Sequence, residues 1–170
     1  MKSIFYILFA GIDSGFFCIN FLQKWTEHLI NNSESPQDWL IDLTMCSDTE
    51  SALNILRKCL SNSDKTLDEG YGETLIGFLC LGLENKILSL GKFFSEVIDV
   101  MDSYEIVDLD IDDLLQLYKR DQFLSEEIQR LISYKFKKYR DNSNHLYRYL
   151  IDNELYKKER LMIEVQKITL

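Results

Sequence analysis

Residues 74–90, TLIGFLCLGLENKILSL, form the most apolar part of this 170-residue chain and decide its fold class. Gly77 and Gly82 lie within the stretch, and each costs a helix interior about 1 kcal/mol relative to alanine. Such glycines indicate either a close approach between two helices or a break between short helices. We expect residues 74–90 to provide the central element of the fold.

Helical spacing continues on both sides of this element. Towards the N-terminus, apolar residues recur at helical intervals from Phe17 to Ile30, and further helices are expected around 36–46 and 47–61. Ser35 before Pro36, and Ser47 three residues before Glu50, are typical helix-start signals. The run Ile4–Phe9 is too short to distinguish a buried strand from a helix, and both alternatives remain open.

Towards the C-terminus, the helical spacing runs through Phe93, Phe94, Val97, Ile98 and Met101. Shorter helices are expected from Asp110–Asp113 and from Ser125, whose acidic neighbours suit a first helical turn. The polar runs 61–72 and 141–144 predict a surface loop and a turn, and 145–168 predicts one long helix or two.

These signals predict an all-α protein: one domain over residues 1–170, folded as an irregular bundle of about eight helices. The composition agrees with a packed chain, since 46% of the residues are hydrophobic and only one proline and seven glycines are present. The sequence shows no strand pairing, no hairpin dipeptide and no internal repeat of about 20–50 residues. The sequence therefore predicts a globular helical chain with a sizeable core.

Immediately after the central element comes an acidic stretch, EVIDVMDSYEIVDLDIDD, residues 96–113, which contains no lysine or arginine. Apolar residues from Val97 to Ile111 run through it, so we expect burial to anchor the segment while its charges face one side. A dense negative surface repels itself unless a basic molecule meets it. The candidate partner-binding residues are its eight carboxylates: Glu96, Asp99, Asp102, Glu105, Asp108, Asp110, Asp112 and Asp113.

Charge is unevenly distributed along the chain. The net charge is −9, with −13 over residues 1–118 and +4 over residues 119–170. A protein that reads nucleic acid normally presents a dominant basic face, so direct nucleic-acid binding is not expected. The first two-thirds of the chain instead favour a basic protein partner.

Cysteine usage and the N-terminal region both favour a cytoplasmic protein. The four cysteines have no Cys-x-x-Cys spacing and sit among apolar neighbours, which is typical of reduced core thiols. The runs 4–12 and 16–22 together approach the length of a membrane span. Asp13 interrupts them, at a cost of about 2.5–3.5 kcal/mol in a bilayer, so no membrane role is expected.

No motif predicts catalysis, a cofactor or a metal site. Asp108, Asp110 and Asp112 imitate the start of a calcium loop, but Asp113 replaces its required glycine and Lys119 its bidentate glutamate. The glycines of 70–74 lack the remainder of a phosphate-binding motif. His28 and His145 have no ligand or nucleophile spacing, and we expect exposed helical histidines.

Lys135, Lys137, Lys138 and Arg140 form a basic run interleaved with aromatic residues. An RNA-facing helix is one interpretation. The core stripe accounts for Phe136 and Tyr139, however, which favours an ordinary solvated cationic face. This face would also balance the acidic stretch within the fold.

Two segments resemble known proteins: Gly11-Ile12-Asp13-Ser14-Gly15-Phe16 followed by Trp25, and Pro36-Gln37-Asp38-Trp39-Leu40-Ile41-Asp42-Leu43. They are similar to the N-terminal half of small bacterial immunity proteins of contact-dependent growth inhibition and polymorphic toxin systems. The resemblance covers roughly the first third of the chain and carries no functional residues. It implies a cytosolic inhibitor that binds one cognate toxin, commonly a nuclease.

The residues and the resemblance together predict an immunity protein, not an enzyme. Its partner would be a basic toxin domain, an RNase or DNase, held at the acidic stretch where the toxin expects phosphates. The alternatives are a solvated acidic surface without a partner, or a helical adaptor with a different protein partner. The oligomeric state is left open.

Overall fold

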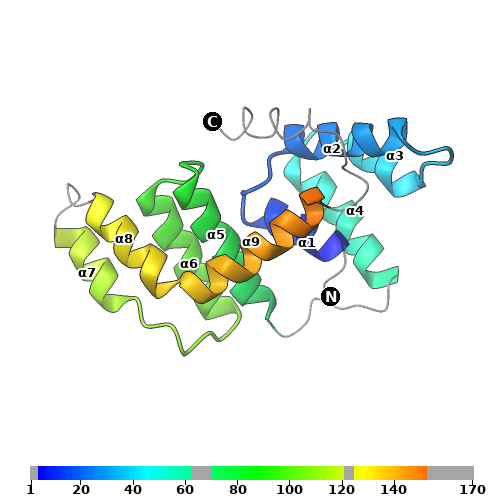
Figure 1. Ribbon diagram of the computed structural model, residues 1–170. Helices are drawn as coiled ribbons and strands as arrows, with labels where there is room; N and C mark the ends of the chain where they lie inside the picture. The colour runs from blue at the N-terminus through cyan, green and yellow to red at the C-terminus, as the bar shows by residue number, and fades with distance from the viewer. Residues whose placement is uncertain (1–3, 63–69, 121–124, 153–170) are drawn as a thin grey trace. The chain divides into compact units, whose positions relative to one another are not determined.

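The computed structural model describes residues 4–62, 70–120 and 125–152 (Figure 1). Within these ranges the chain forms nine α-helices and no strand, so the all-α prediction is confirmed, with one helix more than the expected eight or so. The described residues group into two compact units, the first made of 4–62 with 146–152 and the second of those between 70 and 145. The expectation that the whole chain folds as one domain stays a prediction.

The first unit is built on aromatic packing between short helices. Phe17 stacks on Phe21 with ring centroids 4.5 Å apart, and Trp39 meets Phe5 edge-on at 4.9 Å. The run Ile4–Phe9, which the sequence left undecided, is helical. Helix α1 packs against α4, and α2 against α3. The helices wholly within this unit are α1 (Ile4–Asp13), α2 (Ile19–Asn31), α3 (Asp38–Thr44) and α4 (Thr49–Asn62).

Two of the predicted helix starts are wrong by one or two residues. Helix α3 begins at Asp38 with Gln37 before it, so Ser35 is not its cap. At α4, the capping carboxylate is that of Asp48, which accepts a hydrogen bond from the backbone N–H of Ser51 at 2.8 Å. This hydrogen bond lowers the pKa of Asp48, because the bond stabilises the ionised form. The Ser47 hydroxyl donates a hydrogen bond to the Asp48 carboxylate, and Ser47 is not the cap.

The second unit is organised around α5 (Tyr71–Glu84), which contains residues 74–84 of the apolar stretch; the expected element is shorter at its C-terminal end, because residues 85–89 lead into the next helix. All but two of its residues are buried, and several of the buried side chains belong to a hydrophobic core shared with the following helices. A Cβ added at Gly77 would lie 2.3 Å from the backbone oxygen of Tyr139. Gly77 therefore permits a close helix approach, the first of the two alternatives that its position left open. The other helices are α6 (Leu90–Ser103), α7 (Asp112–Arg120), α8 (Ser125–Lys135) and α9 (Lys137–Asp152), which ends in the first unit.

The predicted turn at 141–144 is wrong, because these residues lie inside α9. Ser143 is fully buried, and its hydroxyl donates a hydrogen bond to the backbone oxygen of Thr74 at 3.0 Å. The loop expected at 61–72 is shorter at both ends, since α4 extends to Asn62 and α5 begins at Tyr71. Residues 63–69 and the expected helix beyond 152 lie outside the described ranges.

Two smaller expectations concern the cysteines and the membrane. All four cysteines are free, but only Cys46 and Cys80 are buried, and Cys18 is exposed, so the prediction of four core thiols is wrong for Cys18. In the part of the chain that the structure describes, no helix combines the length and the apolar character that a bilayer crossing requires.

Candidate partner-binding surface

The acidic stretch spans the end of α6, a loop and the start of α7. Just after the end of α6, the backbone N–H of Ile106 donates a hydrogen bond to the backbone oxygen of Met101 at 3.0 Å. Glu105 turns the chain there with a φ of +51°, in the left-handed region that glycine usually occupies after a helix. A glutamate in this conformation costs of order 1 kcal/mol or more.

Buried side chains anchor the stretch within the second unit, as expected. Val97, Leu109 and Ile111 all belong to the core cluster that includes α5 and α8. The loop also lies directly on the first turn of α5, since a Cβ added at Gly72 would come within 2.7 Å of the Tyr104 Cβ atom. These contacts fix the backbone that carries the charges, so the negative surface has a defined shape.

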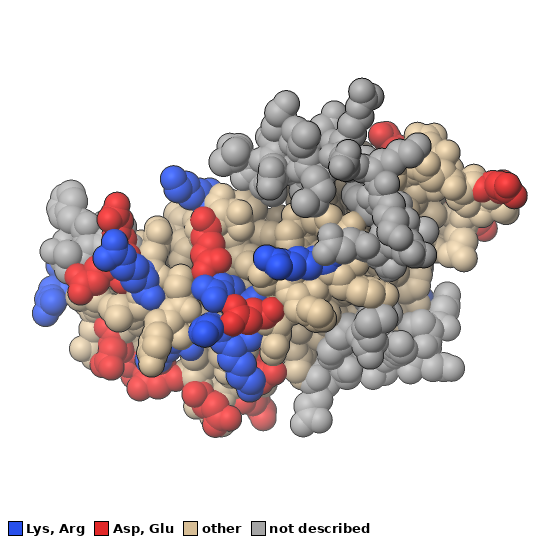
Figure 2. Space-filling view, viewed as in Figure 1, with Lys and Arg blue, Asp and Glu red and all other residues tan. Residues whose placement is uncertain are grey.

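Seven of the eight candidate carboxylates are exposed, and Glu96 is half-buried. Glu96 forms an ion pair with Lys92 one turn earlier in α6. The Asp110 carboxylate accepts a hydrogen bond from the backbone N–H of Asp112 at 3.0 Å, which shapes the entry to α7. The eight residues lie along one continuous segment from α6 to the first turn of α7, and two of them also have local structural roles. Acidic side chains gather along the lower edge of the second unit in Figure 2, where the α6–α7 loop runs.

Not all of the apolar residues in the stretch are anchors. Val107 is 88% exposed, and Tyr104 and Ile98 are 45% and 36% exposed. The expectation that the apolar residues of 96–113 would be buried is therefore wrong for Val107 and Ile98. Sequence periodicity could not reveal this, because Val107 lies in a loop where no helical period assigns a face. The loop therefore presents one apolar side chain among its exposed carboxylates.

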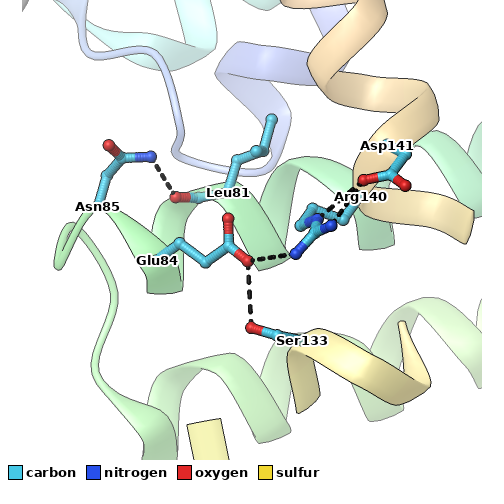
Figure 3. A network of polar contacts seen from close by, with 6 residues as sticks. All are labelled: Leu81, Glu84, Asn85, Ser133, Arg140 and Asp141. Atoms are coloured by element: carbon cyan, nitrogen blue, oxygen red, sulfur yellow. Dashed lines mark hydrogen bonds and ion pairs between the residues drawn. The ribbon is translucent and has the colours of Figure 1, made fainter. Parts of the chain in front are cut away.

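The basic run at 135–140 divides between structure and surface. Phe136 and Tyr139 are buried, as the core stripe predicts, whereas Lys137 and Lys138 are exposed. Arg140 is held in a polar network that joins α9 to α5 (Figure 3). Its guanidinium contacts the Glu84 carboxylate at 3.1 Å and the Asp141 carboxylate at 2.7 Å.

These hydrogen bonds raise the pKa of Arg140 further, the bond to Asp141 having the larger effect. Glu84 also accepts a hydrogen bond from the Ser133 hydroxyl at 3.1 Å, so α8 joins the same network. Because the charged groups of the network are paired with one another, its role in joining α5, α8 and α9 is enough to explain it.

A pocket of about 350 Å³ lies beside this network, lined by residues of α5, α8 and α9 that include Cys80 and Arg140. The Cys80 thiol does not suit nucleophilic catalysis, because burial, the main cause, and the nearby Glu84 carboxylate raise its pKa. Among the described residues, no three acidic, histidine or cysteine side chains gather as metal ligands. His28 and His145 lie on separate helices, in the first and second units.

Comparisons of this chain with protein-family models, with curated proteins and with solved structures found no match.

Proposed function

We propose that this chain is a stoichiometric binding protein that captures a cationic protein through the acidic stretch of residues 96–113. One observation carries the proposal: exposed carboxylates and the exposed Val107 share a loop that buried Leu109 and Ile111 hold in place. A rigid loop with mixed apolar and negative side chains fits a partner that presents a small apolar surface bordered by lysine or arginine.

The resemblance of the first third of the chain to bacterial immunity proteins supports a more specific form of the proposal. The chain would act in the cytoplasm as an immunity protein and neutralise a cognate toxin, with a nuclease domain as the partner. A nuclease binds phosphates through basic residues, and the carboxylates would occupy that basic site in place of the nucleic acid. No catalytic residue and no cofactor of this chain takes part.

The two kinds of side chain should contribute differently to binding. Long-range attraction between opposite charges accelerates association, about 10- to 10³-fold in steered complexes, and is weakened by salt. Burial of Val107 acts after contact. Its replacement by alanine removes about two buried methyl groups, worth roughly 1.5 kcal/mol, so dissociation should accelerate about tenfold.

The test is co-expression with the product of the adjacent gene, followed by binding kinetics at several salt concentrations. Asp99, Asp102 and Asp108 would be changed together to lysine, because all three are exposed. The matched control reverses Asp38 and Asp42 of α3 and Glu50 of α4, which are also exposed.

We expect slower association for the first triple variant and faster dissociation for Val107→Ala, with little change for the control. Equal kinetics for both triple variants would refute the assignment of the surface. If the adjacent product does not bind at all, the immunity function fails and an adaptor with another protein partner replaces it.

A further inference from the structure

Helix α8, yellow in Figure 1, carries charges of opposite sign at its two ends. Glu126 and Glu127 are exposed in its first turn. Lys135 is half-buried in its last turn, and the exposed Lys137 and Lys138 follow directly at the start of α9. The exposed charge along this segment therefore changes from negative to positive.

Two other charges lie on or beside the segment without reversing this order. Arg130 is exposed three and four residues after the glutamates, where helical side chains are neighbours, so it offsets one of the two negative charges. Asp141, further along α9, forms an ion pair with Arg140. The start of α8 thus stays negative, and the lysines beyond its end stay positive.

Exposed apolar side chains lie between the charged ends. Tyr134 is 84% exposed and Leu131 is 41% exposed, and their spacing of three residues places them on one side of the helix. The helix dipole already favours acidic residues at the start of a helix and basic residues at its end, so the charges alone require no partner. The dipole does not account for apolar side chains in water halfway along the helix.

Helix α7 shows the difference, because it has the same order of charges. Asp112 and Asp113 begin this helix, and Lys119 and Arg120 end it. Its apolar side chains are nevertheless all buried or half-buried. An exposed apolar centre between opposite charges therefore distinguishes α8 from a helix of the same unit.

We propose that two copies of this chain form a two-fold dimer in which their α8 helices lie antiparallel, with Leu131 of each copy against Tyr134 of the other. With a helical rise of about 1.5 Å per residue, the midpoint between these two residues is about 9 Å from the glutamates and about 8 Å from Lys137 and Lys138. The lysines of each copy therefore stand opposite the glutamates of the other, whereas a parallel pair would oppose like charges. A two-fold axis through the midpoint closes the assembly.

A helix with an exposed tyrosine and lysines could instead bind single-stranded RNA, with a base stacked on Tyr134. Charge favours the second copy, because Glu126 and Glu127 would repel phosphates but match the lysines of another copy. The inference does not rest on the proposed function, since it uses no residue of the acidic stretch.

Sedimentation velocity of the full chain tests the association and its apolar centre. We expect a monomer–dimer equilibrium below about 1 mM. Tyr134→Ser should raise the dimer dissociation constant at least about tenfold, because the side chain is buried twice in each dimer, and Tyr134→Phe should leave it nearly unchanged. A chain that stays monomeric up to about 1 mM, or that dimerises equally well with Tyr134→Ser, would overturn the proposal.

A charge exchange tests the antiparallel arrangement. One double variant combines Glu126→Lys with Glu127→Lys, which makes both ends of α8 positive, and the other combines Lys137→Glu with Lys138→Glu, which makes both negative. Each variant alone should dimerise at least about tenfold more weakly than the unchanged chain, whereas an equal mixture should form a heterodimer. Lys119→Glu with Arg120→Glu is the matched control at the end of α7 and should dimerise like the unchanged chain.

A mixture that associates no more tightly than either variant alone would overturn the antiparallel pair. Retention of a single-stranded RNA oligonucleotide on a filter, abolished by Tyr134→Ser in a chain that does not dimerise, would assign α8 to RNA instead. The circular dichroism spectrum of each variant shows whether its helices are retained, and heterodimer formation itself requires both variants to be folded.

Discussion

Replacement of Gly77 by alanine should destabilise the second unit, although alanine is the better helix former. The helix propensity of alanine favours the variant by about 1 kcal/mol. The added Cβ, however, would lie 2.2 Å from the Ser143 hydroxyl oxygen and 2.3 Å from the backbone oxygen of Tyr139. A side chain could rotate away, but a backbone oxygen moves only if α5 and α9 separate.

The magnitude follows from three contributions. Overpacking costs about 1–3 kcal/mol, and loss of the buried hydrogen bond from Ser143 to Thr74 adds about 1 kcal/mol. After the helix-propensity gain, the free energy of unfolding should fall by about 1–3 kcal/mol. With a slope of about 2 kcal/mol per M, the urea midpoint of the second unit should fall by about 1 M.

The assay is urea unfolding followed by far-ultraviolet circular dichroism, because both tryptophans, Trp25 and Trp39, lie in the first unit. Gly82→Ala is the matched control in the same helix. Its added Cβ meets only the flexible side chain of Leu88, at 3.0 Å, which can shift. A midpoint for Gly77→Ala equal to or above that of Gly82→Ala would refute the close approach of α5 and α9.

Three further outcomes follow from local contacts. Asp48→Ala should lower the urea midpoint, whereas Ser47→Ala should not. Because the pKa of Asp48 is lowered in the folded chain, the stability difference between Asp48→Ala and the unchanged chain should reach its full size well above the unfolded pKa of about 3.9 and vanish as the pH falls below the folded pKa. Iodoacetamide labelling followed by mass spectrometry should modify the exposed Cys18 first and the buried Cys80 last; equal rates would contradict the burial. Glu84→Gln should lower the free energy of unfolding by no more than about 1 kcal/mol in a urea titration, because the ion pair it removes is partly exposed; a loss of several kcal/mol would contradict this exposure.

The fold class could be predicted because long helical patterns survive in the sequence, above all in the stretch that became α5. The turn expected at 141–144 failed for a tertiary reason. A run of Asp, Asn and Ser usually breaks a helix, but Ser143 is buried against Gly77 and bonds to Thr74. This contact between distant residues outweighs local propensity, and no local pattern reveals it.

The candidate surface was predictable to a different extent. The density of carboxylates in 96–113 is a property of the sequence alone, and the burial of Leu109 and Ile111 followed from their apolar character. The exposure of Val107 and Ile98 did not, because each depends on which way a loop or helix faces after packing. Apolar residues are expected inside, so exposed ones such as these are visible only in the structure.

These exposed residues bear on whether the acidic stretch is only a solubilising surface. Solubility requires charge, and the carboxylates supply it without help from their neighbours. A solubilising surface gains nothing from Val107 in water or from Glu105 in a conformation that glycine adopts at lower cost. Both features lower solubility or stability, and each could be removed by one substitution. Their presence on a loop that the core holds in place is the reason we propose contact with another protein surface, which the dissociation rate of Val107→Ala would test.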